Sequence, residues 1–251
     1  MSAATPPAPV ALITGAAHRL GARTAQVLHQ RGWRVVIHYR SREQQANTLA
    51  GDLNRQRENS ALAIQADLGQ MGEIRRLGEE ATAQWGRLDG LINNASVFYP
   101  TPTPEAREDD WNTILNTNLK APFFLLQTCL PALRAARGSV VNMIDIYSER
   151  PLPDHPLYCA SKAGLAALTR SWAKDLAPDI RVNGVSPGAI LWPEGGGEID
   201  EQHQQTILDK TALARTGSPD DIAETIAFLI NDAPFITGQI LPVDGGRSLN
   251  M

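Results

Sequence analysis

Two residues of this chain, Tyr158 and Lys162, have types and a spacing that suit acid–base chemistry. Side chains four residues apart lie on the same face of a helix. An ammonium group a few ångströms from a phenol stabilises the phenolate, so we expect Lys162 to lower the pKa of Tyr158 and make it a usable acid or base near neutral pH. Pairs at this spacing also occur widely as structural neighbours.

A carboxylate, Asp145, ends a predicted strand shortly before the Tyr158 helix. It is placed to meet the phenol across a cleft. The alternative is a carboxylate that only caps a turn.

Short β-branched runs alternate with helical stretches along the chain, which predicts a parallel sheet with helices on both faces. The runs are almost continuously apolar, as strands buried on both faces must be. We therefore predict an α/β fold of the doubly wound Rossmann type with seven parallel strands, as a single domain over residues 10–251 after a disordered lead-in at 1–9. The predicted strands are Val10–Thr14, Arg34–Tyr39, Ala61–Ala66, Gly90–Asn93, Ser139–Ile144, Arg181–Val185 and Ile240–Val243.

Helices are expected between these strands, and Gly32 and Gly86 are expected to end two of them in the left-handed conformation. Irregular composition from Ser186 to Asp200 predicts a mobile loop. The predicted helices are Gly21–Arg31, Gly72–Trp85, Tyr158–Leu176 and a segment that Ser218 caps and that runs through Ile230.

The composition narrows the class of protein. The chain has 251 residues, 43% of them hydrophobic, and a net charge of -4. We expect no nucleic-acid partner, because there is no basic excess, and no membrane span, because no apolar run approaches about 20 residues. Without a recognisable export signal, a cytoplasmic location is expected. Cys129 and Cys159 are expected to be buried reduced thiols, and no metal site is predicted.

The turn from Gly15 to Gly21 joins a strand to a helix, where backbone N–H groups and the helix dipole can hold a diphosphate. The next strand ends in Tyr39, Arg40, Ser41 and Arg42. A carboxylate at this position would favour NAD. The sequence has two guanidinium groups here instead, which favour the 2′-phosphate of NADPH. The alternative is a solvated basic turn.

Polar residues also follow the third and fourth strands. Asp67 and Leu68 close the third strand, where Asp67 can accept from an adenine amino group or cap a helix. Asn94, Ala95 and Ser96 follow the fourth strand, on the side of such sheets where ligands bind.

Taken together, several motifs resemble the short-chain dehydrogenase/reductase family over nearly the whole chain. They are the TGxxxxxG turn from Thr14 to Gly21, Asn93-Asn94-Ala95, Asn118, Tyr158 to Lys162, Pro187-Gly188, Thr237-Gly238-Gln239 and Val243 to Gly246. The resemblance implies catalytic roles for Asn118, Tyr158 and Lys162, with Asn118 holding a water that connects Lys162 to solvent. Two positions depart from the family: Asp145 replaces the serine 13 residues before the tyrosine, and Arg19 replaces the second glycine of the turn.

A closer resemblance is to the pteridine reductase branch of this family. It rests on both departures and on the segments Asn94–Pro100 and His38-Tyr39. That resemblance implies that Arg19 contacts cofactor phosphate and a pterin, that Ser96 contacts the ligand, and that Phe98 stacks on the bicyclic ring. It also implies that Asp145 and Tyr158 contact the substrate and pass a proton to a ring nitrogen. The expected cofactor is NADPH, the expected substrate a dihydropterin or folate, and the expected assembly a homotetramer.

The residues expected to bind the cofactor come from several strand ends. They are Gly15, His18, Arg19, Leu20, Tyr39, Arg40, Ser41, Arg42, Asp67, Leu68, Asn94, Ala95, Ser96, Tyr158, Lys162, Pro187 and Gly188.

Two other functions stay open. A ketone reductase, for example one acting on a 3-oxoacyl thioester, would use Tyr158 to protonate a carbonyl oxygen, but an anionic Asp145 would oppose the developing oxyanion. A non-catalytic NADPH-binding regulator would not need Tyr158 and Lys162. The choice among dihydrobiopterin, dihydromonapterin and dihydrofolate depends on the loop at Ile190 to Trp192, where Trp192 either closes over the substrate or packs on a neighbouring subunit.

Overall fold

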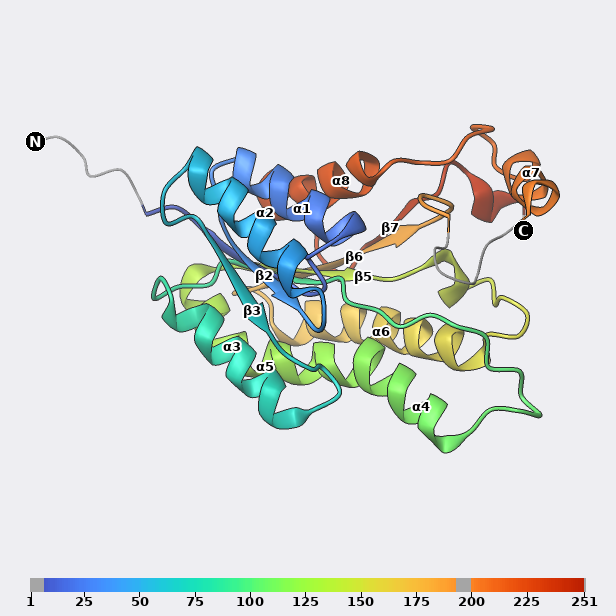
Figure 1. Cartoon of the computed structure of the whole chain (residues 1–251), viewed down its shortest axis with the longest axis horizontal. Helices are drawn as coiled ribbons and strands as arrows, with labels where there is room; N and C mark the ends of the chain where they lie inside the picture. Colours follow the sequence, from blue (N-terminus) through green and yellow to red (C-terminus); the bar gives the residue numbers. More distant parts are fainter. Residues whose placement is uncertain (1–6, 193–199, 251) are drawn as a thin grey trace, which may run out of the picture.

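The computed structural model describes residues 7–192 and 200–250 of the chain. Within them, seven parallel strands form one sheet in the order β3-β2-β1-β4-β5-β6-β7, with helices on both faces (Figure 1). The predicted Rossmann-type architecture is therefore confirmed, and each predicted strand is present with its ends shifted by two residues at most. The strands are β1 Val10–Ile13, β2 Arg34–Tyr39, β3 Ala61–Gln65, β4 Gly90–Asn93, β5 Ser139–Met143, β6 Arg181–Pro187 and β7 Ile240–Val243.

The helices follow the predicted capping signals. Gly32 and Gly86 have φ angles of +92° and +66°, as expected of left-handed positions after a helix. The Ser218 side chain accepts a hydrogen bond from Asp221 N and caps the helix that follows. The helices are α1 Arg19–Gln30, α2 Glu43–Gln56, α3 Met71–Ala83, α4 Glu108–Leu115, α5 Ala121–Ala136, α6 Pro156–Asp175, α7 Glu201–Asp209 and α8 Pro219–Asn231, with the π-helix η1 Asn116–Lys120 and the 3-10 helices η2 Ile146–Ser148 and η3 Arg247–Leu249.

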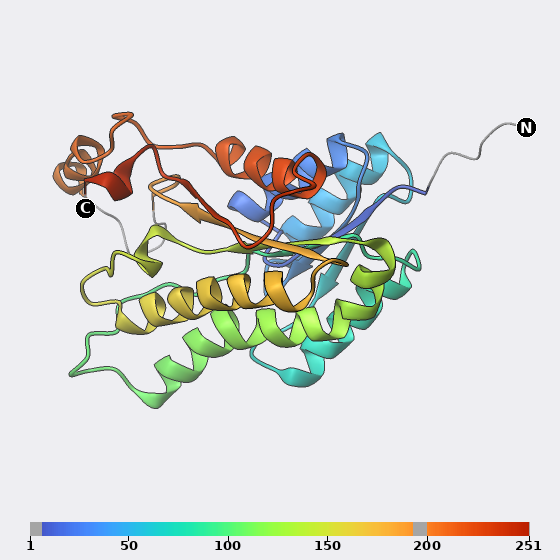
Figure 2. The same cartoon turned by 180° about the vertical axis from the view of Figure 1, so that it is seen from behind.

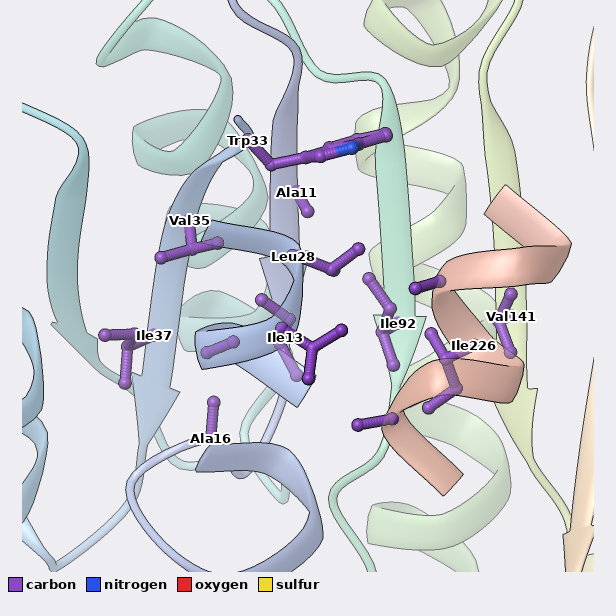
Figure 3. Close-up of a cluster of buried hydrophobic side chains, with 14 of the residues drawn as sticks. Ala11, Ile13, Ala16, Leu28, Trp33, Val35, Ile37, Ile92, Val141 and Ile226 are labelled. Carbon is purple, nitrogen blue, oxygen red and sulfur yellow. The ribbon is translucent and has the colours of Figure 1, made fainter. Parts of the chain in front are cut away.

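Successive side chains of a strand point to opposite faces of the sheet, and β1 shows the result. Ala11 and Ile13 pack with residues of α1, α2 and α8, whereas Val10 and Leu12 pack with residues of α3, α5 and α6. Figure 1 and its reverse view, Figure 2, show these two helical layers above and below the sheet. Figure 3 shows the first cluster, with Ala11 and Ile13 beside the side chains of α1 and α8. Both faces of the sheet are therefore buried, which explains the continuous apolar runs.

The strand order also determines where a ligand can bind. From β1 the chain moves outward to β2 and β3 and then returns to β4 on the other side of β1. The connections after β1 and β4 therefore diverge to opposite faces and leave a crevice at the carboxyl ends of these strands. The residues predicted to bind a cofactor follow these strand ends.

Part of the predicted loop from Ser186 to Asp200 is regular. Ser186 and Pro187 belong to β6 and pair with Pro242 and Val243 of β7. The part at 193–199 lies outside the described residues, as does 1–6 of the predicted lead-in.

The described helices include none that is long and apolar enough to cross a membrane. Cys129 and Cys159 are free and buried, as predicted. The described residues hold no cluster of His, Cys, Asp and Glu side chains that could bind a metal ion.

Candidate active site

A cavity of about 350 Å³ lies at the carboxyl ends of β1, β2, β3 and β4. Most of the residues predicted to bind the cofactor line it, although they come from four separate strand ends. These residues are Gly15, His18, Arg19, Leu20, Tyr39, Arg40, Ser41, Arg42, Asp67, Leu68, Asn94, Ala95 and Ser96.

The first turn approaches the end of β4 closely. Gly15 has a φ of +62°, and a Cβ atom at this position would lie 3.0 Å from the Cα of Ala95. The Asn94 side chain donates hydrogen bonds to the carbonyl oxygens of Thr14 and Gly15, at 2.8 and 3.2 Å. The turn is therefore held in place by β4, and only glycine fits at position 15.

A buried histidine from β2 supports the same turn. The backbone N–H of Gly15 donates to Nδ1 of His38 at 3.0 Å, so Nε2 must carry the ring proton, which it donates to the Ala66 carbonyl at 3.0 Å. His38 is 2% exposed, and burial lowers its pKa from 6.5 to about 4. The neutral imidazole thus fixes the position of the turn that is predicted to bind phosphate.

The part of the cavity after β2 is basic. Arg40 and Arg42 line it, and in the described part of the chain neither guanidinium group contacts a carboxylate. Two unneutralised cations beside a glycine turn at a helix start fit the 2′-phosphate and the diphosphate of NADPH. Asp67 lines the same cavity, and its Oδ1 accepts from Gly69 N at 2.8 Å. The alternative role of Asp67 as a helix cap is wrong, because Gln70 is the N-cap of α3.

The proposed acid–base residues meet where the chain leaves β5 and where α6 begins. The Tyr158 hydroxyl donates to Oδ2 of Asp145 at 2.7 Å, and Oδ1 of Asp145 accepts from the backbone N–H of Tyr147 at 2.9 Å. Asp145 therefore both caps η2 and binds the phenol, so the two interpretations of this residue are compatible. Lys162 is fully buried, and its Nζ donates to the Met143 carbonyl at 2.9 Å and lies 5.7 Å from the centre of the Tyr158 ring.

The charges around Tyr158 correct one prediction. The pKa of Tyr158 is raised well above its usual value, not lowered, first by burial and then by the negative charge of Asp145. Lys162 does not offset these effects, because its ammonium group faces the ring and binds a carbonyl oxygen instead of the hydroxyl. Burial lowers the pKa of Lys162 to about 8, against the opposing effect of Asp145. Removal from solvent likewise raises the pKa of Asp145.

Asn118 lies in the π-helix η1, and its side chain is fully hydrogen-bonded. Nδ2 donates to the Val97 carbonyl at 2.9 Å and to Ser161 Oγ at 3.1 Å. Oδ1 accepts from Val97 N at 2.8 Å and from Ser96 Oγ at 3.3 Å. The Asn118 side chain therefore positions the segment after β4 and has no capacity left for the predicted water, which only its backbone could hold.

Phe98 projects from the segment after β4 toward α6 and is 45% exposed. Its ring stacks on His155, with centroids 4.7 Å apart and planes at 13°, and meets Tyr158 edge-on at 4.7 Å. One face of Phe98 is thus covered by His155, and the residue as a whole is still 45% exposed.

Arg19 adopts the left-handed conformation, with a φ of 54°. This conformation explains why the family has glycine here. The Arg19 guanidinium donates to the carbonyl oxygens of Leu191 and Trp192 at 3.2 and 3.0 Å. It therefore links the first turn to the segment after β6, which is the loop expected to select the substrate.

Several residues fall outside the pattern predicted from sequence. Four residues predicted to bind the cofactor do not line the cavity: Tyr158, Lys162, Pro187 and Gly188. A Cβ at Gly188 would lie 2.7 Å from the Cα of Asp244, which gives this glycine a packing role. Sequence reasoning missed five residues of the cavity, each of which is next in the chain to a predicted residue. The five are Ala17, Gly21, His38, Val97 and Thr117.

The parallel sheet, the cavity at its switch point and the Tyr158–Lys162 pair define a nucleotide-dependent oxidoreductase. A family model described as Enoyl-(Acyl carrier protein) reductase matches residues 15–248. Pteridine reductase 1 of Leishmania tarentolae is 35% identical over 286 aligned positions, which cover 98% of each chain. The 3-oxoacyl-[acyl-carrier-protein] reductase FabG of Staphylococcus aureus (strain Mu50 / ATCC 700699) is also 35% identical, over 239 positions that cover 94% of this chain and 96% of the relative.

A solved structure is similar as well. The crystal structure of a blue fluorescent protein from a metagenomic library, in complex with NADPH, matches with a TM-score of 0.88 and 31% identity over 95% of this chain and 97% of that one. The chain belongs to the short-chain dehydrogenase/reductase family and is an NAD(P)H-dependent reductase.

Proposed function

We propose that this protein is a pteridine reductase that uses NADPH to reduce dihydropterins, and folates of the same ring system, to the tetrahydro form. The observation that carries the proposal is the 2.7 Å hydrogen bond from Tyr158 to the carboxylate of Asp145. A carboxyl group here gives the tyrosine a partner that can itself carry a proton, which suits protonation of a ring nitrogen.

The chemistry adds a hydride and a proton across a C=N bond of the ring. Bound NADPH supplies the hydride. Tyr158 donates the proton to the ring nitrogen, and Lys162 holds the end of β5 beside it through the hydrogen bond from its Nζ to the Met143 carbonyl. A proton carried by Asp145 then replaces the one that Tyr158 has lost, and the raised pKa of Asp145 favours its protonated form.

The same geometry argues against a ketone substrate. Reduction of a carbonyl builds negative charge on an oxygen next to Tyr158, and Asp145 stands where the family has a serine, so no serine hydroxyl at this position can donate to that oxygen. The Phe98 ring, 45% exposed and in contact with Tyr158, suits a flat heterocycle, since stacking on an aromatic ring contributes about 1 to 3 kcal/mol per base. Arg19 lines the cavity and adds a positive charge to it, which favours a phosphate.

Two further parts of the proposal rest on other residues. Arg40 and Arg42 support a preference for NADPH over NADH. The exposed Trp111 and Phe123, on α4 and α5, support association into the tetramer that the family resemblance implies, because large exposed apolar side chains favour burial in an interface.

Turnover assays test the proposal. Purified protein with NADPH should consume the cofactor steadily when dihydrobiopterin or dihydrofolate is added, and should be inactive with a 3-oxoacyl thioester. The Asp145→Ser variant, which restores the family's residue, serves as the matched control and should lose pterin turnover. Rapid reduction of the thioester by the unmodified protein, without pterin turnover, would refute the proposal.

A further inference from the structure

Three cationic side chains line a second cavity, separate from the one at the first turn. They are Arg150, just after η2, Lys210, at the end of α7, and Arg247, the first residue of η3. The cavity has a volume of about 350 Å³, and Pro151 completes its lining. Figure 1 shows α7, the red segment that contains η3 and the yellow-green segment after β5 at the same end of the molecule.

No carboxylate of the described chain forms an ion pair with Arg150, Lys210 or Arg247, although Asp145 lies close enough to Arg247 to feel its charge. The two acidic residues next to it in sequence have other partners: Glu149 pairs with Arg170 at 3.6 Å, and Asp209 accepts from Gln205 at 2.7 Å. Arg150 and Lys210 are exposed, whereas the Nε of Arg247 is buried and has no hydrogen-bond partner among the described residues. Cations that converge on one cavity without a counter-ion repel each other and form a site for an anion.

This cavity adjoins the acid–base residues. Arg247 donates from Nη2 to the Tyr147 hydroxyl at 3.1 Å, and its guanidinium lies 5.8 Å from the centre of the Tyr147 ring. The backbone N–H of Tyr147 in turn binds Oδ1 of Asp145. Arg247 is also close enough to Asp145 to counteract, by its charge, part of the rise in the pKa of that carboxyl. An anion held by the cluster would therefore lie next to a ligand whose reactive ring contacts Tyr158.

We infer that Arg150, Lys210 and Arg247 bind the anionic tail of the substrate. The inference rests on the proposed function and extends it, because it favours pteridines with carboxylates on their side chain, such as folates, over those with a neutral side chain. Guanidinium and ammonium groups bind carboxylate and phosphate alike. A phosphate-bearing thioester is therefore a second source of the same ligand chemistry, and the experiment separates the two.

The test uses the protein loaded with NADPH and a variant with Arg150→Gln and Lys210→Gln. Arg247 is left unchanged because it contacts Tyr147. We expect the Kd of dihydrofolate, measured by calorimetry, to rise roughly tenfold, since two partly screened ionic contacts are lost. The Kd of dihydrobiopterin, whose side chain is neutral, should stay within about twofold. Added salt should weaken dihydrofolate binding to the unmodified protein more than to the variant.

A charge-matched control carries Arg75→Gln and Lys174→Gln, which remove two exposed cations outside both cavities. It should bind both ligands like the unmodified protein. An unchanged Kd for dihydrofolate in the Arg150→Gln, Lys210→Gln variant would overturn the inference. The proposed function would still stand if the unmodified protein reduced pterins.

If the unmodified protein reduced no pterin or folate, the proposed function would fail independently. The cluster would then be tested with a 3-oxoacyl coenzyme A thioester, which carries phosphates, and a 3-oxoacyl N-acetylcysteamine thioester, which does not. A tenfold rise in the Kd of the coenzyme A thioester alone, in the Arg150→Gln, Lys210→Gln variant, supports the anion site with phosphate as its occupant. An equal change in the Kd of both thioesters overturns it.

Discussion

Acidification should destabilise this protein through the buried imidazole of His38. The neutral ring accepts from Gly15 N and donates to the Ala66 carbonyl, so protonation would replace an acceptor with a donor facing the Gly15 N–H. Because the pKa of His38 is about 4 in the folded chain and 6.5 without burial, the unfolded state binds more protons between these values. The stabilisation is therefore complete above about pH 6.5 and is lost as the pH falls toward 4.

The magnitude follows from the two pKa values. In this pH range a difference of one bound proton changes the free energy of unfolding by about 1.4 kcal/mol per pH unit. Between pH 7.5 and pH 5 the His38 contribution to the free energy of unfolding should therefore fall by about 2 kcal/mol. Since Gly15 lies in the wall of the cofactor cavity, NADPH affinity should fall over the same range.

The assay is urea unfolding at both pH values for the unmodified protein and for His38→Gln. Glutamine keeps one acceptor and one donor but does not titrate, so it serves as the reference. The difference between the two proteins isolates His38 from the other four histidines, among which burial also lowers the pKa of His29. If both proteins lost the same free energy of unfolding on acidification, the reasoning would be refuted.

Three further predictions concern the active site. Tyr158→Phe should reduce pterin turnover by at least about 10²-fold, the lower range for a general acid, with little change in NADPH affinity measured by fluorescence titration; full activity would contradict the acid assignment. In the Asp145→Asn variant, lowering the pH should raise pterin turnover less than it does in the unmodified protein, because an amide carries no proton to Tyr158. Comparison of the pH–rate profiles of the two proteins would show this. Replacing Arg40 and Arg42 by alanine should weaken NADPH about tenfold or more without weakening NADH, and equal loss for both cofactors would argue against 2′-phosphate binding.

The sheet and the cofactor cavity were predictable because their signals are local. Apolar runs of strand length, the Gly15 turn and the basic residues after β2 each depend on a few neighbouring residues, and parallel pairing brings all strand ends to one edge. The role of His38 was not predictable in this way, because its two partners, Gly15 and Ala66, are far away in the sequence. A histidine inside an apolar strand only indicates that such partners must exist.

The direction of the Tyr158 pKa shift shows a second limit of sequence reasoning. The spacing of Tyr158 and Lys162 correctly places both side chains on one face of α6. It does not show that the Lys162 ammonium donates to the Met143 carbonyl, nor that the Tyr158 hydroxyl has a carboxylate partner. The pKa depends on which atoms meet and on how much water they lose, and both are properties of the packed structure.

Arg19 connects the fold, the cofactor cavity and the substrate loop. A non-glycine residue in the left-handed conformation costs about 1 to 2 kcal/mol, so glycine at this position would relieve strain. The chain instead carries a side chain whose guanidinium reaches the carbonyl oxygens of Leu191 and Trp192 while lining the cofactor cavity. Strain of this kind persists where the side chain performs a task that glycine cannot. Here the task is to supply a cationic group between the cavity and the segment of Leu191 and Trp192. In the proposed function, the departure from the family at position 19 and the one at position 145 would therefore act on the same ligand.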